Sequence, residues 1–144
     1  MTTPSSAALS SIRILLIDDD DFQIDFITDL LGQLGVQNIR STTGGETAMQ
    51  MLGTRAQFPD LILCDIHMPG IDGFELMKLL GDRDFSGGVI LMSGQGSRVL
   101  YSASLVAQLA RLNFLGTIEK PLQKETLLPM LEQIASGTPS DRPT

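Results

Sequence analysis

The chain has 144 residues, of which 42% are hydrophobic, and its formal net charge at pH 7 is −7. This length fits one domain with one hydrophobic core, and the hydrophobic content excludes a disordered chain. The negative charge, without any run of Lys or Arg, argues against binding to nucleic acid or to an anionic membrane. No apolar run approaches the roughly 20 residues that span a bilayer, and residues 1–10 lack a secretory signal, so we predict a cytoplasmic protein.

Short apolar runs alternate with longer amphipathic stretches along most of the chain, which predicts strands alternating with helices. The predicted strands are Ile12 to Ile17, Asn38 to Ser41, Leu61 to Cys64, Val89 to Met92 and Phe114 to Ile118. The third strand is apolar without alternation, which is typical of a central parallel strand covered on both faces.

Five helices are predicted between and after these strands. The first runs from about Phe22 to Leu34, with Phe22, Phe26, Leu30, Leu31 and Leu34 on one face. The second carries Ala48, Met49 and Leu52, and the third runs from about Phe74 to Leu80. The fourth spans Ser97 to Leu112, with Leu105, Val106, Leu109 and Leu112 facing inward, and the last spans Lys124 to Ala135.

This alternation predicts an α/β fold with a doubly wound, five-stranded parallel sheet and helices on both faces, because parallel neighbours need right-handed crossover connections. The domain is expected to span residues 11–136. Residues 1–10 and 137–144 are small and polar, so we expect a flexible N-terminal tail and a C-terminal tail or linker.

The informative polar residues follow the predicted strands. Ligands bind beyond the carboxyl ends of the strands in open sheets of this kind. Asp18 and Asp19 follow the first strand, Asp65 the third, Ser93 the fourth and Lys120 the fifth. We therefore expect three carboxylates, a hydroxyl and an ammonium to meet in one pocket.

This set of groups is suited to phosphoryl transfer. Oxygen ligands without thiolates favour a hard cation, so we expect Mg²⁺, with Mn²⁺ able to substitute. Asp65 can act as the nucleophile, while the metal and Lys120 neutralise phosphoryl oxygens and Ser93 donates a hydrogen bond. Asp20 or Asp21 is expected to serve the helix start alone, and Asp72 a turn or helix cap.

Four segments in order resemble the receiver domains of two-component response regulators. They are ILLIDDDD, LILCDIHMPGIDGFEL, ILMSG and EKPL, and the resemblance covers about Ser11 to Ala135. It implies a flavodoxin-like receiver fold in which Asp65 accepts a phosphoryl group from a histidine kinase or a histidine phosphotransfer protein. It further implies that Asp18, Asp19, Asp65 and the backbone carbonyl of His67 hold Mg²⁺.

The same resemblance implies a cis bond between Lys120 and Pro121 and a movement of Ser93 toward the phosphoryl group. That movement would shift the surface of the fourth helix, fifth strand and fifth helix, and so control an output domain or a target protein. The chain would then be a signalling domain that catalyses only its own phosphorylation and dephosphorylation. His67 and Gln95 occupy positions that tune dephosphorylation in such domains.

The chain departs from the family pattern at Thr117, where an aromatic switch residue is common, and the segment from Ser93 to Lys120 is longer than usual. This longer segment is weakly similar to receivers that precede EAL-type cyclic-di-GMP phosphodiesterase domains. Family likeness also suggests a homodimer through the fourth helix.

Two other functions remain open, and a third is rejected. An Mg²⁺-dependent aspartyl-phosphate hydrolase generally needs an acid two residues after the nucleophile, where this chain has His67. A receiver-like interaction module that is never phosphorylated usually lacks pocket residues that are present here. The SGQGS segment is not a dinucleotide loop, because Val99 stands at the place of the third glycine.

Overall fold

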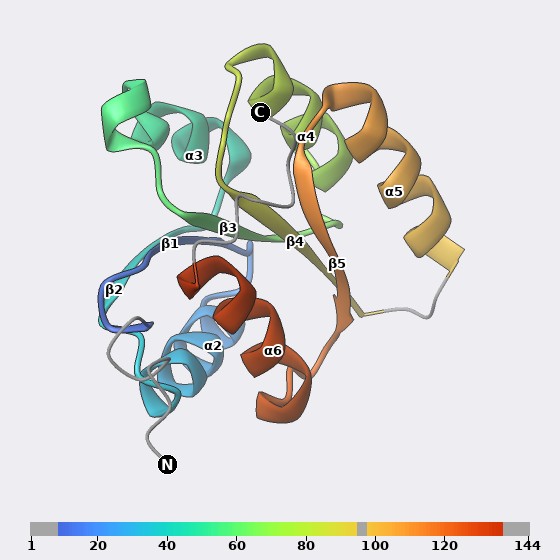
Figure 1. Cartoon of the computed structure of the whole chain (residues 1–144). Helices are drawn as coiled ribbons and strands as arrows, with labels where there is room; N and C mark the ends of the chain where they lie inside the picture. The colour runs from blue at the N-terminus through green and yellow to red at the C-terminus, as the bar shows by residue number, and fades with distance from the viewer. Residues whose placement is uncertain (1–8, 95–97, 137–144) are drawn as a thin grey trace.

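The computed structural model describes residues 9–94 and 98–136, and its centre is a five-stranded parallel sheet in the order β2-β1-β3-β4-β5 (Figure 1). The strands are β1 (Arg13–Ile17), β2 (Asn38–Thr42), β3 (Leu61–Asp65), β4 (Gly88–Ser93) and β5 (Asn113–Glu119). All five predicted strands are therefore confirmed, with bounds that differ by one residue.

Helices cover both faces of this sheet. They are α2 (Asp21–Gln33), α3 (Gly45–Leu52), α4 (Gly73–Asp82), α5 (Arg98–Ala110) and α6 (Lys124–Ala135), with a short 3-10 turn η1 (Arg55–Gln57) after α3. Figure 1 shows α2 and α6 on one side of the sheet and α3, α4 and α5 on the other. The doubly wound fold is thus confirmed. Within the described residues, no helix is long and apolar enough to cross a membrane.

Two apolar layers hold the helices to the sheet. Because successive strand residues point to opposite faces, Leu16 enters the layer under α2 and α6, and its neighbour Ile17 enters the layer under α3, α4 and α5. Every residue of β3 and β4 is buried. Among the described elements, the central strands β3 and β4 are therefore buried along their whole length.

The packed domain begins before Ser11. Leu9 is only 2% exposed and belongs to the apolar layer under α2 and α6. The side-chain amide of Asn38 donates to the carbonyl of Ser10 at 3.0 Å. The prediction that residues 1–10 form a flexible tail is wrong for Leu9. The segment is mostly polar, but the side chain of Leu9 is apolar and packs into the core.

The buried face of α2 differs from the predicted one. Phe22 is 76% exposed and Phe26 is 40% exposed, whereas Ile24 and Ile27 are buried. The helix has apolar residues around much of its circumference, and the aliphatic stripe that continues into Leu30 and Leu31 packs on the sheet. The two aromatic residues at the start of α2 therefore face solvent.

The buried face of α5 also differs. Leu105 and Leu109 are exposed, whereas Ala103 and Ala107 are buried. Val106 and Leu112 do pack against the core, as predicted. Small residues permit close approach of the helices: a Cβ on Gly81 of α4 would lie 2.7 Å from the carbonyl oxygen of Ala110. The close fit excludes bulky leucines from this face.

The turn after β3 brings α4 against the strand end. A Cβ on Gly73 would lie 2.8 Å from Cα of Ile66 and 3.0 Å from the carbonyl oxygen of Asp65, so only glycine fits there without displacement. Asp72 caps α4 by accepting a hydrogen bond from the backbone N–H of Glu75 at 2.9 Å, which confirms its predicted role as a cap. The turn thereby fixes the backbone that carries Asp65.

Candidate functional site

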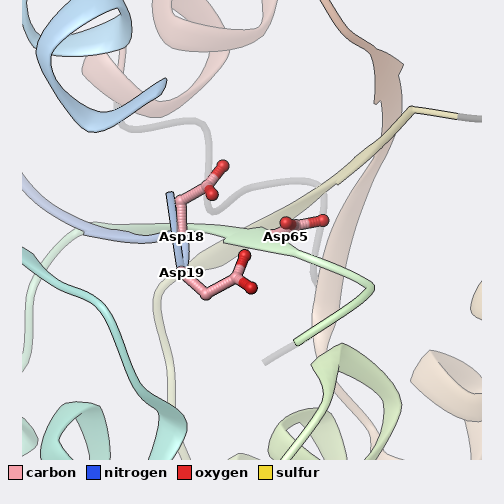
Figure 2. A group of neighbouring side chains, drawn as sticks. All are labelled: Asp18, Asp19 and Asp65. Carbon is pink, nitrogen blue, oxygen red and sulfur yellow. The ribbon is translucent and has the colours of Figure 1, made fainter. Parts of the chain in front are cut away.

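Three carboxylates meet at the carboxyl ends of β1 and β3. Asp18 and Asp19 follow β1, and Asp65 is the last residue of β3, the strand next to β1 in the sheet. One oxygen of each carboxylate lies within 4.8 Å of the others (Figure 2). Asp18 is fully buried and Asp65 is 5% exposed, while Asp19 is exposed. The predicted acidic cluster therefore forms, with two of its members buried.

Asp20, the next acidic residue along the chain, caps a helix. The side chain of Asp20 accepts a hydrogen bond from the backbone N–H of Phe22 at 2.9 Å and so caps α2. The expectation that Asp20 or Asp21 serves the helix start is thus confirmed for Asp20.

Lys120 provides the positive charge of the cluster. Its Nζ lies 2.7 Å from Oδ2 of Asp18 and 3.1 Å from Oδ2 of Asp65. Burial alone would lower the pKa of Lys120, but the hydrogen bonds and charges of Asp18 and Asp65 outweigh burial and raise it. The side chain is therefore an ammonium at neutral pH and bridges the two buried carboxylates.

The carboxylate of Asp65 is oriented through both of its oxygens. Oδ2 accepts a hydrogen bond from Nζ of Lys120, and Oδ1 accepts one from the backbone N–H of His67 at 3.1 Å. Burial raises the pKa of Asp65 and the charge of Asp18 adds to the increase, although Lys120 and the His67 N–H oppose it. This carboxylate is therefore oriented by two hydrogen bonds in an environment that disfavours its charge.

Ser93 lies at the carboxyl end of β4, beside Lys120. It is the last residue of β4 and is 1% exposed. The backbone N–H of Lys120 donates to the carbonyl of Ser93 at 2.8 Å, and the bond between Lys120 and Pro121 is cis. On the other side, β4 pairs Met92 with Asp65. Strand pairing thus places Ser93 between the strands that carry Asp65 and Lys120.

The structure brings together most of the residues that the sequence indicated. His67 is exposed, and it contacts Asp65 through its backbone N–H. Gln95 lies outside the described residues. The sequence did not indicate that Asp18 is the nearest carboxylate to Lys120, because that contact depends on the order of β1, β3 and β5 in space.

The donor set fits a hard divalent cation. Three carboxylates converge, and this site contains no thiolate ligand, which is the chemistry that Mg²⁺ prefers. A single ammonium beside three carboxylates leaves an excess of negative charge, which a cation would offset.

Comparison with known proteins identifies the family. The model of the response regulator receiver domain matches residues 14–132, and the chain belongs to this family. Solved receiver domains have the same fold: that of a CheY-like receiver domain protein from Methanospirillum hungatei superimposes with a TM-score of 0.73, at 22% identity, over 90% of this chain and 98% of the other.

Curated relatives place the domain in longer proteins. The 3',5'-cyclic-nucleotide phosphodiesterase regA of Dictyostelium discoideum is 32% identical over 127 residues, which are 87% of this chain and 15% of that protein. A two-component response regulator of Arabidopsis thaliana is 33% identical over 87 residues, which are 60% of this chain and 22% of that protein. The chain therefore corresponds to a small part of each relative.

Proposed function

We propose that the chain is a phosphoacceptor that takes a phosphoryl group on Asp65 and thereby switches the surface formed by α5, β5 and α6. The observation that carries this proposal is the position of Asp65. Its carboxylate is held between the ammonium of Lys120 and the backbone N–H of His67, beside Asp18 and Asp19.

Asp18, Asp19 and Asp65, with the backbone carbonyl of His67, are the residues that would hold Mg²⁺, and Mn²⁺ should substitute. A bound divalent cation supplies positive charge that offsets the carboxylates and the phosphoryl oxygens. The cluster has the oxygen donors for this role, and Lys120 supplies the only positive charge that contacts both buried carboxylates within the described residues.

The chain's own residues supply the rest of the chemistry. An oxygen of Asp65 attacks the phosphorus of a phosphohistidine donor, so a phosphorus–oxygen bond forms while the phosphorus–nitrogen bond breaks and the imidazole leaves. Lys120 stabilises negative charge on the transferring group, and the Ser93 hydroxyl donates to one phosphoryl oxygen. Attack by water later releases phosphate and restores the Asp65 carboxylate.

The donor in this proposal is a histidine kinase or a histidine phosphotransfer protein in the cytoplasm. The switched surface acts on an output domain, of the EAL type or another, on a target protein, or on a second copy of the chain. The curated relatives support this placement, because they include two-component response regulators in which the matching segment is a small part of a longer protein.

The test is intact-mass measurement after incubation with acetyl phosphate and Mg²⁺. Wild type should gain the mass of one phosphoryl group, and Asp65→Asn should gain none. Asp72→Asn is the matched control, since it removes a nearby carboxylate that caps α4, and it should still be phosphorylated. Chelation of the metal should abolish the gain in wild type and in Asp72→Asn.

Two other results would favour the competing functions. Unchanged mass without phosphate release, although Mg²⁺ binds, would indicate an interaction module that is not phosphorylated. Release of phosphate from many organic phosphates, with turnover and without a lasting adduct, would indicate a hydrolase.

The roles of His67 and Gln95 have a separate readout. Replacing either residue with alanine should change the lifetime of the phosphoryl group on Asp65 without preventing its formation. The lifetime is measured by the decay of the phosphorylated mass after the phosphodonor is removed. An unchanged lifetime in both variants would contradict the tuning role.

A further inference from the structure

A second cavity lies at the opposite ends of the strands from the carboxylate cluster. It has a volume of about 330 Å³ and involves the starts of β1 and β2, the end of α3, and η1. The residues that matter for its chemistry are Arg13, Leu15, Arg40, Met51, Gln57 and Pro59. A volume near 300 Å³ is at the lower end of the range for small-molecule sites.

The cavity lies beside the end of α3. The helix has eight residues and ends at Leu52, and Gly53 follows with a φ of 71°, which favours glycine. The chain then passes through η1 to Pro59 at the cavity wall. Met51 and Gln57 border the space beside the beginnings of β1 and β2.

Strand register places two arginines on this same face. Arg40 pairs with Leu15, and Arg13 lies two residues before Leu15, so all three side chains leave the sheet on the side of α3. No carboxylate lines the cavity among the described residues. Because Asp60 forms an ion pair with Arg13, the uncompensated positive charge at this cavity is that of Arg40.

The two guanidinium groups differ in the contacts that they make within the chain. Arg13 is fixed, because its Nη2 donates to the carbonyl of Phe58 at 2.7 Å and its Nε lies 3.8 Å from Asp60. Within residues 9–94 and 98–136, no carboxylate forms an ion pair with Arg40. Arg40 can therefore pair with an anion from outside the chain, next to a second guanidinium already held in place.

We propose that this cavity binds a small organic anion, of about the size of a nucleoside monophosphate, with its anionic group at Arg40 and Arg13. The body of the ligand lies against Met51 and Pro59, which are half-buried and offer apolar surface. Gln57 adds polarity at the rim, where its Oε1 already accepts a hydrogen bond from the backbone N–H of Thr54 at 2.9 Å. The site is separate from Asp65, since it lies at the other end of the strands.

The experiment is an NMR titration of the metal-free full chain, with chelator present, using AMP, adenosine and inorganic phosphate as probes. AMP should shift the signals of Arg40, Met51 and Gln57 and bind more tightly than adenosine or phosphate alone. Arg40→Ala should weaken AMP binding by roughly tenfold to a hundredfold, because a hydrogen-bonded charge pair is lost.

Arg55→Ala is the matched control. Arg55 is exposed, pairs with Asp84 at 3.7 Å and does not line the cavity, so its loss should leave AMP affinity unchanged. A well-dispersed spectrum for Arg40→Ala shows that the variant is folded, and this check does not depend on phosphorylation of Asp65.

Three results would overturn the proposal. Equal weakening by Arg55→Ala would mean that AMP responds only to surface charge. Shifts confined to Asp18, Asp65 and Lys120 would place the anion at the carboxylate cluster. Absence of any response to AMP, with binding of a Glu-rich peptide instead, would mean that the arginines bind an acidic segment of a partner protein.

Discussion

The apolar middle of the sheet and the polar carboxyl ends of its strands contribute to stability with opposite signs. In the middle of the sheet, β3 and β4 are buried along their whole length by apolar contacts from both layers of helices. At the carboxyl ends of β1, β3 and β4 lie Asp18, Asp65 and Ser93, which are the buried polar residues of the described chain. Burial of apolar surface stabilises the native state, whereas burial of a carboxylate opposes it. The core therefore supports a site that is unfavourable by itself.

The largest effect is expected from a cavity in the core. Leu63 is fully buried in β3, and Leu63→Ala should reduce the free energy of unfolding by about 2–5 kcal/mol. Urea unfolding followed by circular dichroism measures the loss. Leu109→Ala is the control, because Leu109 is 78% exposed and should change stability by less than about 0.5 kcal/mol. Equal losses would contradict the assignment of buried faces.

Asp72 lies near the site but stabilises the fold, so its removal should lower the free energy of unfolding, as removal of a core side chain does. Asp72→Ala removes the cap of α4 and should destabilise by about 1 kcal/mol. Asp82→Ala, at the other end of the same helix, should be neutral or slightly stabilising because an acid opposes the dipole there. Chemical unfolding of both variants decides between these outcomes.

Replacement of Asp65 should change stability in the opposite direction and make the protein more stable. Its raised pKa means that folding disfavours the charged form, so Asp65→Asn should raise the thermal midpoint of the metal-free protein by a few degrees at neutral pH. Mg²⁺ should raise the midpoint of wild type and have little effect on the variant. Calorimetry with and without Mg²⁺ tests both statements. A lower midpoint for Asp65→Asn would mean that its ion pair with Lys120 outweighs the cost of burial.

The smallest effect concerns pH. Because burial raises the pKa of Asp65, the folded state binds this proton more tightly than the unfolded chain does. Stability from this group is therefore present at low pH and lost as pH rises through the folded pKa. Carboxyl carbon NMR of the metal-free protein should show Asp65 titrating above an ordinary Asp, and Mg²⁺ should move the midpoint down, because metal and proton compete. A midpoint at or below the ordinary value would contradict the burial argument.

Sequence periodicity was sufficient to predict the fold and the cluster of Asp18, Asp19 and Asp65. Each strand is a short apolar run with a polar residue at its end, and parallel topology brings such ends together. The sequence could not show which face of α2 or α5 is buried, since both helices carry apolar residues on more than one side. On α5 the size of the side chains determines which face is buried. Ala103 and Ala107 allow close packing that Leu105 and Leu109 would prevent.

Contacts that depend on strand order were also beyond the sequence. The sequence predicted that Asp18, Asp65 and Lys120 meet at one edge of the sheet, but which carboxylate lies nearer to Lys120 depends on the order of the strands, which no local pattern records. Arg13 and Arg40 likewise form no run in the sequence, and only the register of β1 with β2 places them on one face. Both features would have required the pairing of strands to be known in advance.

The hydrogen bond from the backbone N–H of Lys120 to the carbonyl of Ser93 couples the end of β4 to the start of the loop after β5. Ser93 cannot move away from β5 without lengthening this bond or carrying Lys120 with it. The rate of deuterium exchange at the backbone amide of Lys120 therefore reports whether this hydrogen bond opens. This rate would rise if the two residues separate and stay low if they move together.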